Sequence, residues 1–259
     1  MSGGETVPAD DRGLLLGDGL FETLLARDGA LEEFDRHLAR MTRGAAVLGI
    51  APPDAAEARR LAEAALAAQG LARGRAAVRI TLTAGAGRGL ERPEGSRGRL
   101  ICAASPAPAP AGPARLALSG VRRNDTSPAS RLKALSYLDN VLARRQARAA
   151  GADEALLLNT RGELACAAAA NLFWITGGRL CTPALECGVL DGIMRARVLE
   201  AAAALGMEAA EVRAGPAALE AAEALLLTNS LMGVREVGWM DGRAFGPHAL
   251  AAALSSRCS

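Results

Sequence analysis

The order of apolar and polar residues along this chain predicts short strands and amphipathic helices separated by turn residues. Runs rich in branched apolar side chains predict strands at residues 21–27, 31–34, 76–84, 98–104, near 115–119, 154–159, 163–175, 223–228 and 233–239. Apolar residues that recur every three or four positions predict helices at residues 35–48, 54–69, 136–150 and 193–205. Strands and helices are mixed, and hairpin turns such as Asp28-Gly29 join several strands, so we expect an α+β fold.

A proline-rich segment divides these predicted elements into two groups. Residues 106–113 contain four prolines in eight positions, and proline continues neither a helix nor a central strand. We therefore expect a semi-rigid Pro/Ala-rich linker at 106–114. It would join a smaller N-terminal domain at 1–105 to a larger C-terminal domain at 115–259.

Composition and charge argue against several classes of function. The formal net charge of +2 gives no reason to expect nucleic acid or an anionic membrane as a partner. No stretch of about 18 apolar residues lacks charges, and residues 1–11 contain no apolar signal core. The five cysteines form no CxxC pair, and their odd number fits free thiols in a reducing compartment, so we expect a cytoplasmic protein. His37 and His248 are far apart, so we expect no metal site.

One residue is chemically unusual in this composition. The chain contains thirty Lys and Arg residues, and Lys133 is the only lysine. A guanidinium serves in salt bridges but cannot act as an amine nucleophile, because its pKa stays too high. A lysine can form a Schiff base with a carbonyl group, above all with pyridoxal phosphate (PLP). Lys133 is therefore a candidate for a position where only an amine works, and Tyr137, the only tyrosine, lies four residues further on.

Eight short motifs occur in order between about residues 11 and 240. They are Arg12-Gly13-Leu14 with Gly17-Asp18-Gly19-Leu20-Phe21-Glu22-Thr23, then His37-Leu38-Ala39-Arg40, Leu132-Lys133-Ala134-Leu135-Ser136-Tyr137-Leu138, Gly151-Ala152-Asp153-Glu154-Ala155, Ala170-Asn171-Leu172-Phe173, Thr182-Pro183, Gly188-Val189-Leu190-Asp191-Gly192-Ile193-Met194-Arg195 and Thr228-Asn229-Ser230-Leu231-Met232. The series resembles the class IV aminotransferase-fold enzymes, the fold-type IV family of PLP-dependent enzymes. The resemblance implies a two-domain α+β fold like that of D-amino-acid aminotransferase, PLP as cofactor, a small amino-acid-type substrate and a homodimer.

The resemblance also implies roles for individual residues. Lys133 would form the Schiff base with the cofactor and move the substrate Cα proton, and Tyr137 would lie near the cofactor's phenolate oxygen. The phosphate would bind to Arg40, to the amides of Ile193 and Met194, and to Asn229 and Ser230. The glycine loop before residue 193 opens a helix, whose free amides and dipole suit a dianion. Asp191 stands where many relatives have proline, and we expect it to point away from the phosphate or to cap the helix.

Cys166 departs from the family pattern. Relatives carry a glutamate here that pairs with the pyridine nitrogen of PLP, whereas a thiol is a weak donor and mostly uncharged. We expect Glu163 on the opposite face of the strand, because it lies three residues away. A local bulge could bring its carboxylate back, the enzyme could work with a poorer electron sink, or it could be catalytically weak.

The family contains more than one reaction. Motifs such as Asn171-Leu172-Phe173-Trp174 resemble aminodeoxychorismate lyase, which releases pyruvate from 4-amino-4-deoxychorismate and forms 4-aminobenzoate for folate synthesis. The alternatives are a branched-chain or D-amino-acid aminotransferase, and a cofactor-binding homologue whose catalysis is weak or lost because of Cys166. Arg88, in the glycine-rich turn at residues 85–89, is a candidate for binding a substrate carboxylate.

Overall fold

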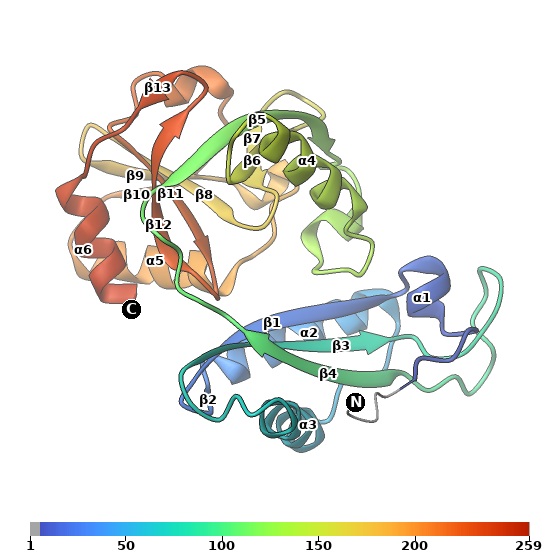
Figure 1. Ribbon diagram of the computed structural model, residues 1–259. Coiled ribbons are helices and arrows are strands. Elements are labelled where there is room, and N and C mark those ends of the chain that lie inside the picture. The colour runs from blue at the N-terminus through green and yellow to red at the C-terminus, as the bar shows by residue number, and fades with distance from the viewer. Residues whose placement is uncertain (1–5, 259) are drawn as a thin grey trace. The chain divides into compact units, whose positions relative to one another are not determined.

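The computed structural model describes residues 6–258, and the chain divides into two compact units (Figure 1). The first unit contains the chain up to Ala109 together with Leu132–Ser136, and the second contains Pro110–Arg131 and the chain from Tyr137 onward. Lys133 therefore belongs to the first unit and not, as the predicted boundary implies, to the C-terminal one. Each unit is described by itself.

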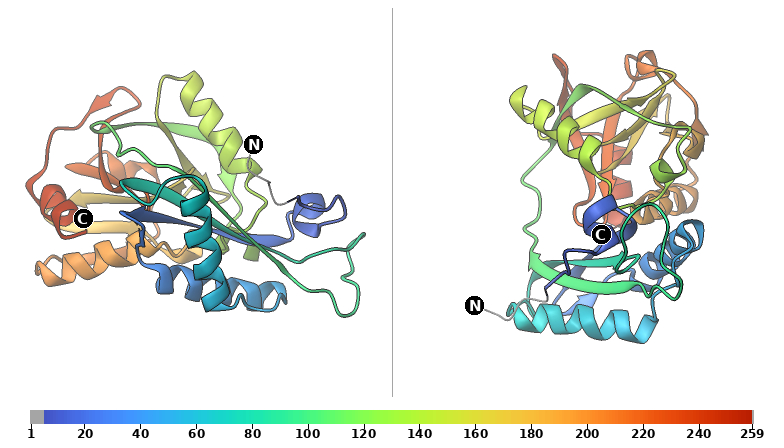
Figure 2. Two further views of the ribbon diagram at one scale, coloured as in Figure 1. Left: turned by 60° about the horizontal axis from the view of Figure 1, so that its bottom comes forward. Right: turned by 90° about the vertical axis from the view of Figure 1, so that its right-hand side faces the viewer.

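The first unit is a four-stranded antiparallel sheet with helices on one face. Its elements are α1 (Arg12–Leu16), β1 (Gly19–Arg27), β2 (Ala30–Leu31), α2 (Phe34–Leu48), α3 (Ala55–Ala68), β3 (Arg75–Thr83) and β4 (Arg99–Pro106). The strand order is β2-β1-β3-β4. Alternate residues of β1 and β3 pack with α2 and α3 in a single apolar cluster, so both helices cover the same face of the sheet (Figure 2).

Local sequence signals explain where these helices begin and end. The Asp54 side chain accepts a hydrogen bond from the Glu57 amide and caps the start of α3. Helix α2 ends at Gly49, whose φ of 63° lies in the left-handed region that glycine adopts without strain.

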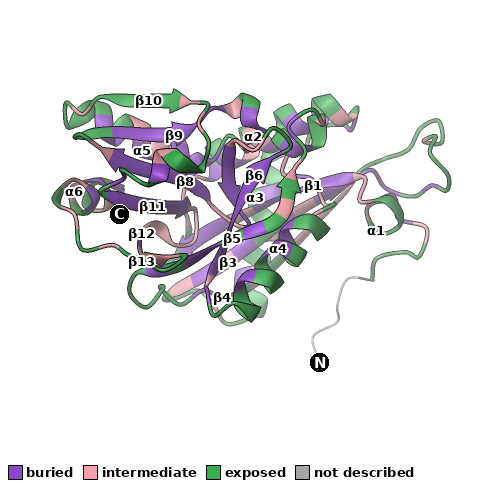
Figure 3. Cartoon of the chain, turned by 90° about the horizontal axis from the view of Figure 1, so that it is seen from above, coloured by how far each residue is buried: buried purple, intermediate pink, exposed green. Residues whose placement is uncertain are grey.

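The second unit is built on a nine-stranded mixed sheet. Its elements are β5 (Ala114–Arg123), the short helix η1 (Pro128–Arg131), α4 (Leu138–Ala149), β6 (Glu154–Asn159), β7 (Leu164–Ala167), β8 (Asn171–Thr176), β9 (Arg179–Pro183), η2 (Leu185–Cys187), α5 (Ile193–Ala204), β10 (Ala209–Val212), η3 (Pro216–Leu219), β11 (Ala224–Asn229), β12 (Gly233–Met240), β13 (Arg243–Ala244) and α6 (Ala249–Cys258). The order is β10-β9-β8-β11-β12-β5-β6-β7, and β13 pairs with β12. Strands β8 and β11 are buried along most of their length (Figure 3).

Separate clusters of apolar side chains join the helices to the second sheet. Phe173, Leu226 and Val198 belong to a cluster that joins β8 and β11 to α5 and α6. Ala143 and Leu157 belong to another cluster, which joins α4 to β5 and β6. The start of α5 is thus held against the middle of the sheet, next to the ends of β8 and β11.

The mixed α+β prediction is confirmed, and several elements differ in detail. The single strand predicted at 163–175 is wrong: residues 168–170 interrupt it, and β7 and β8 are separate. Pro106 lies in β4 and Ala114 in β5, so the two ends of the predicted linker belong to strands. The sequence analysis did not predict α1, β9, β10 or α6. No helix among residues 6–258 is long and apolar enough to cross a membrane.

Candidate functional site

Lys133 lies on a short segment that pairs with the edge of β1. The Phe21 amide donates to the Lys133 carbonyl over 2.8 Å, and the Leu135 amide donates to the Gly19 carbonyl over 3.0 Å. An isolated antiparallel bridge lies between these two bonds. The backbone of Lys133 is therefore fixed to the sheet by the first residues of β1.

The side chain of Lys133 contacts an aromatic ring that a second cation also contacts. Lys133 Nζ lies 4.3 Å from the centroid of the Phe21 ring, and Arg79 Cζ lies 3.8 Å from it. Phe21 is buried, Lys133 is half-buried and Arg79 is exposed. Each contact contributes about 0.5–2 kcal/mol. The Phe21 ring thus contacts both the lysine amine and a guanidinium.

Arg40 is held by a buried carboxylate. Glu22 follows Phe21 on β1 and is 1% exposed. Its oxygens accept Arg40 Nε over 2.7 Å and Arg40 Nη2 over 2.6 Å, and His37 Nδ1 lies 2.7 Å from Oε2. Burial raises the pKa of Glu22, but hydrogen bonds from His37 and Arg40 and the charge of Arg40 bring it to about 2. Glu22 is therefore ionised at neutral pH and fixes the plane of the Arg40 guanidinium.

The glycine-rich loop that carries Arg88 is tied down at its base. The Arg12 guanidinium is buried and donates to three carbonyls of the loop, those of Gly89, Leu90 and Glu91. Arg12 also pairs with Asp18, which Arg92 binds from the far end of the loop. The Arg88 side chain is exposed. These bonds therefore fix the loop, and its Arg88 side chain is exposed to solvent.

The predicted phosphate-binding residues lie where α5 begins in the second unit. Gly192 is the N-cap residue, and Ile193 and Met194 are the first two helical residues, both buried. A Cβ on Gly192 would lie 2.0 Å from Asn171 Oδ1, so any other residue would have to displace the Asn171 side chain. Asp191 is exposed and does not occupy the capping position. Gly192 has no side chain that could cap the first amides of α5.

Asn229 organises a turn next to this helix. Its Oδ1 accepts from the amides of Leu231 and Met232 over 3.0 and 2.9 Å, and its Nδ2 donates to the Ala169 carbonyl over 2.9 Å. The side chain therefore links the turn at 229–232 to the β7–β8 connection. Ser230 is half-buried in this turn. The sequence predicts that Asn229 binds the cofactor, whereas in the structure its side chain bonds to backbone groups of the protein.

Cys166 is buried on β7. It is 7% exposed, and burial raises the pKa of its thiol, so it is neutral at physiological pH. It belongs to a small apolar cluster with Cys187 and Val189, which flank Gly188. No carboxylate occupies this position of β7.

The expectation that Glu163 lies on the opposite face from Cys166 is wrong. The register between β6 and β7 shifts at Ala165, so β7 contains a bulge. Glu163 Oε2 lies 3.7 Å from the Sγ of Cys187, a member of the Cys166 cluster. A bulge therefore brings Glu163 toward that face, as one of the alternatives anticipated.

The Glu163 carboxylate is nevertheless occupied by other donors. Asn159 Nδ2 donates over 2.7 Å, Arg213 Nη2 over 2.8 Å and Arg161 Nε over 3.1 Å. Hydrogen bonds from Asn159, Arg213 and Arg161 lower the pKa of Glu163 to about 2. Glu163 is therefore a permanently charged member of a surface network and does not take over the role of a carboxylate at position 166.

Arg123 brings positive charge to the same region. Its guanidinium donates to the carbonyls of Gly188 and Ser130 and, over 3.4 Å, to Asn140 Oδ1. Arg123 thus joins β5 to the loop before α5 and to the segment that leads to Lys133. Tyr137 is half-buried at the N-cap position of α4.

The structure distributes the predicted residues over both units. Lys133, Arg40 and Arg88 lie in the first, and Tyr137, Cys166, Ile193, Met194, Asn229 and Ser230 lie in the second. Sequence reasoning missed Glu22, which binds Arg40, and Arg79, which shares a ring with Lys133. Both lie in regular strand patterns. The pairing of β1 with β3 brings Arg79 near Phe21, and the packing of α2 on β1 brings Arg40 to Glu22.

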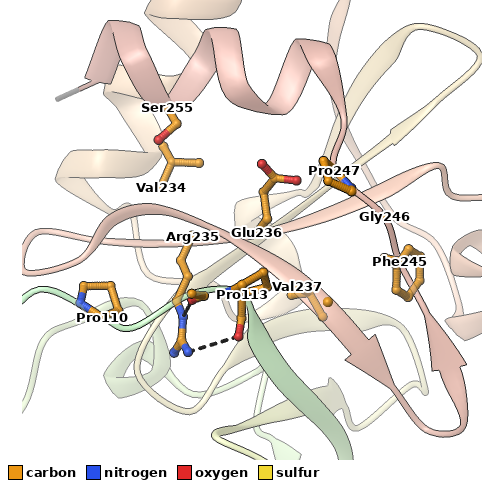
Figure 4. Close-up of a pocket in the computed structure, with 12 residues that line it drawn as sticks. Pro110, Pro113, Val234, Arg235, Glu236, Val237, Phe245, Gly246, Pro247 and Ser255 are labelled. Atoms are coloured by element: carbon orange, nitrogen blue, oxygen red, sulfur yellow. Dashed lines mark hydrogen bonds between the residues drawn. The ribbon is translucent and has the colours of Figure 1, made fainter.

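A cavity of about 340 Å³ in the second unit contains none of the predicted residues (Figure 4). Its wall includes Pro110, Pro113, Glu236 and Phe245. The Arg235 side chain is bound to the carbonyls of Gly112 and Pro113. The cavity follows the chain segment that leads into β5. Among residues 6–258, no group of three or more His, Cys, Asp or Glu side chains could hold a metal ion.

Comparison with known proteins identifies the family. The family model described as amino-transferase class IV matches residues 19–238. A candidate branched-chain-amino-acid aminotransferase of Methanocaldococcus jannaschii is 33% identical over 240 residues, which is 90% of this chain and 82% of that protein. The aminodeoxychorismate lyase of Bacillus subtilis is 30% identical over 227 residues, which is 86% of this chain and 77% of that protein.

Solved structures agree with these sequence matches. The crystal structure of 4-amino-4-deoxychorismate lyase from Pseudomonas aeruginosa superposes with a TM-score of 0.88 at 32% identity, over 98% of this chain and 94% of that chain. A branched-chain aminotransferase from Thermoproteus uzoniensis has a TM-score of 0.90 at 24% identity, over 98% and 89% of the two chains, and shows the shared fold. The chain belongs to the class IV aminotransferase family, and it is an enzyme of the PLP-dependent lyase or transferase type.

Proposed function

We propose that this chain is a PLP-dependent 4-amino-4-deoxychorismate lyase, which forms 4-aminobenzoate and pyruvate. Two observations support the proposal: the backbone of Lys133 is fixed to the sheet of the first unit, and Cys166 of the second unit is a buried, neutral thiol. Lyases among the relatives match nearly the full chain in both sequence and structure. Localisation in the cytoplasm stays a prediction from the sequence.

The residues present suit PLP in most respects. Lys133 supplies the one amine that can hold the cofactor's aldehyde carbon. The amides of Ile193 and Met194 at the start of α5, with Asn229 and Ser230 of the second unit and Arg40 of the first, would supply donors for its phosphate. Tyr137 offers a phenol for the ring oxygen. The ring nitrogen is the exception, because Cys166 brings no charge to it.

The chain's own residues divide the work of the reaction. Bound PLP supplies an electron sink for the electron pair left at the substrate Cα. Lys133 Nζ would take the proton from the substrate Cα and later return a proton to complete the product. Glu22 fixes the Arg40 guanidinium, which would bind the phosphate. Two guanidinium groups of the first unit would bind substrate carboxylates: Arg88 in the glycine-rich loop and Arg79, which contacts the same ring as Lys133.

Cys166 favours elimination over transamination. Without a carboxylate beside it, the ring nitrogen is protonated less, and the electron sink is weaker. Transamination needs a long-lived carbanion, whereas loss of pyruvate from aminodeoxychorismate creates an aromatic product and has its own driving force. The second candidate function is an aminotransferase for branched-chain or D-amino acids, which the M. jannaschii relative favours. A homologue with weak or lost catalysis is the third.

We also propose that the active form is a homodimer. Each unit exposes apolar side chains on a helix. Leu14, Leu15 and Leu16 of α1 are 64, 50 and 45% exposed. Leu138, Val141 and Leu142 of α4 are 67, 50 and 39% exposed and lie on one face of that helix. Such clustered surfaces are typical of interfaces.

A substrate comparison tests the proposed function. The PLP-loaded protein is given 4-amino-4-deoxychorismate, and 4-aminobenzoate and pyruvate are measured. Separate reactions contain D-alanine or a branched-chain amino acid with a keto acid. Lys133→Ala serves as the control in each. Formation of 4-aminobenzoate that depends on Lys133 supports the lyase. Amino transfer to the keto acid, with no formation of 4-aminobenzoate, supports the second candidate.

A further inference from the structure

The cavity of about 340 Å³ in the second unit lies beside a strand whose neighbour on one side begins late. Strand β12 pairs with β11 over its first four residues, but its pairing with β5 begins only at Val237, opposite Ala114. The chain before Ala114 contains Pro110 and Pro113, and proline cannot donate to a strand ladder. The space beside the first half of β12 therefore stays open and forms the cavity.

Hydrogen bonds fix the walls of this cavity. Arg235 Nε donates to the Gly112 carbonyl over 2.9 Å, and Nη2 donates to the Pro113 carbonyl over 3.3 Å. On the other side, the Phe245 amide donates to the Gly238 carbonyl over 3.0 Å. All twelve lining residues belong to the second unit. Sites for small molecules have volumes of about 300–1,000 Å³, so this preformed cavity is large enough for a small ligand.

The positive charge in the wall is neutralised. Of the twelve residues that line the cavity, Arg235 is the only one with a positive charge. Its Nη2 lies 3.2 Å from Asp153 Oδ2, in addition to its bonds with the two carbonyls. Because these acceptors already occupy the guanidinium, Arg235 offers little attraction to an anion.

The negative charge in the wall is not neutralised. In the described part of the second unit, five carboxylates are buried or half-buried: Asp125, Asp153, Glu154, Glu163 and Glu236. The first four accept hydrogen bonds from side chains or amides. The Glu236 carboxylate alone makes no hydrogen bond or ion pair within residues 6–258. A carboxylate that is partly removed from water and has no donor favours the approach of a cation.

Glu236 lies among apolar side chains. Val234 precedes it by two residues on the same face of β12 and packs against the apolar cluster of α6. Figure 4 shows the Glu236 side chain pointing away from that of Arg235, as alternation along a strand requires. The wall also contains Pro247 and the ring of Phe245. The cavity thus combines one unpaired carboxylate with apolar walls.

We infer that this cavity binds a small organic cation, with Glu236 as its counter-ion. The ligand carries an amidinium, guanidinium or ammonium group on an apolar or aromatic body. Its N–H groups donate to the carboxylate, and its body packs against the prolines and Phe245. The cavity contains none of the residues proposed for PLP or substrate, so this site does not depend on the proposed function.

Three probes of one shape and different charge test the site. Benzamidine is a cation, benzamide is neutral and benzoate is an anion. Benzamidine does not compete for the PLP aldehyde as an amine would, because an amidinium stays protonated, as a guanidinium does. Isothermal titration calorimetry measures binding to the PLP-loaded full chain as wild type, Glu236→Gln and Glu186→Gln. Glu186→Gln is the matched control, because Glu186 is exposed in the same unit and lies outside the cavity wall.

The expected order of affinity follows the charge of the probe. Wild type binds benzamidine about tenfold more tightly than benzamide, and benzoate more weakly than either, because only the cation gains a charge-assisted hydrogen bond. Glu236→Gln binds benzamidine no more tightly than benzamide, whereas Glu186→Gln behaves as wild type. The melting temperature and PLP affinity of Glu236→Gln match those of wild type, because the carboxylate has no partner in the protein.

Other results contradict the site. If benzamidine does not bind to wild type, or binds to Glu236→Gln equally well, Glu236 is not the counter-ion of a ligand. If the three probes bind equally, the cavity recognises only an apolar ring. If Glu236→Gln without a probe melts well below wild type, the carboxylate serves the fold. None of these results changes the proposed function, which is tested by the formation of 4-aminobenzoate.

Discussion

Among single residues, the amine of Lys133 is the group on which the proposed chemistry depends. It is the only lysine, and two backbone hydrogen bonds and an aromatic ring fix it. Lys133→Ala is expected to lose all turnover and the visible absorbance that borohydride abolishes. Lys133→Arg is expected to fail equally, because a guanidinium stays protonated and cannot attack the aldehyde. Mass spectrometry of the borohydride-treated protein locates the adduct, and full activity in either variant would contradict the assignment.

The buried carboxylate behind Arg40 predicts a response to acid. The pKa of Glu22 is lowered from 4.5 to about 2, so its ion pair stabilises the folded state above about pH 4.5 and is lost as the pH falls through 2. The shift corresponds to about 3 kcal/mol of unfolding free energy. The difference in unfolding free energy between wild type and Glu22→Gln should therefore shrink from pH 5 to pH 2.

Urea denaturation at several pH values measures this difference. Glu63→Gln on the exposed side of α3 is the control, and it should match wild type throughout. Glu22→Gln is also expected to retain PLP less well on dialysis, because Arg40 loses its orienting partner. A constant difference between wild type and Glu22→Gln across this pH range would mean that the carboxylate is not held as described.

At the scale of elements, the start of α5 requires a glycine. A Cβ at Gly192 would lie 2.0 Å from Asn171 Oδ1, so Gly192→Ala must displace either the Asn171 side chain, which binds the Leu190 carbonyl, or the helix start. Overpacking of this kind costs about 1–3 kcal/mol. We expect weaker PLP retention and a lower melting temperature. Gly120→Ala is the control, because nothing lies within 4 Å of a Cβ there. Equal behaviour of the two variants would refute the close approach.

Sequence patterns predicted most elements but not their interruptions. The run from Leu164 to Asn171 contains alanines with no turn residue, so nothing in it signals that β7 ends and β8 begins. No sequence pattern signals the bulge at Ala165 either. The bulge places Glu163 near Cys187, on the face of the strand that carries Cys166. Lys133 was singled out because it is the only lysine, whereas the role of Glu22 depends on His37 and Arg40 of α2, which pack against it.

At the scale of the whole molecule, the exposed leucines of α1 and α4 predict self-association. Light scattering of the PLP-loaded protein is expected to give twice the chain mass of 26.5 kDa. Replacing Leu14 and Leu138 by glutamate should shift the mass toward that of one chain, because a buried charge without a partner opposes association. The control is the melting temperature of each variant, which should show that the variant is still folded. A fully active protein of 26.5 kDa would refute the dimer.

The proposed type of reaction depends most directly on Cys166. The direct measurement is the ratio of lyase to transaminase turnover in wild type and in Cys166→Glu, at matched PLP loading. A carboxylate at this position restores protonation of the ring nitrogen and strengthens the electron sink. We predict that wild type forms 4-aminobenzoate faster than it transfers amino groups, and that Cys166→Glu raises transamination. An unchanged ratio would show that the cysteine only packs the strand and that the reaction is decided elsewhere.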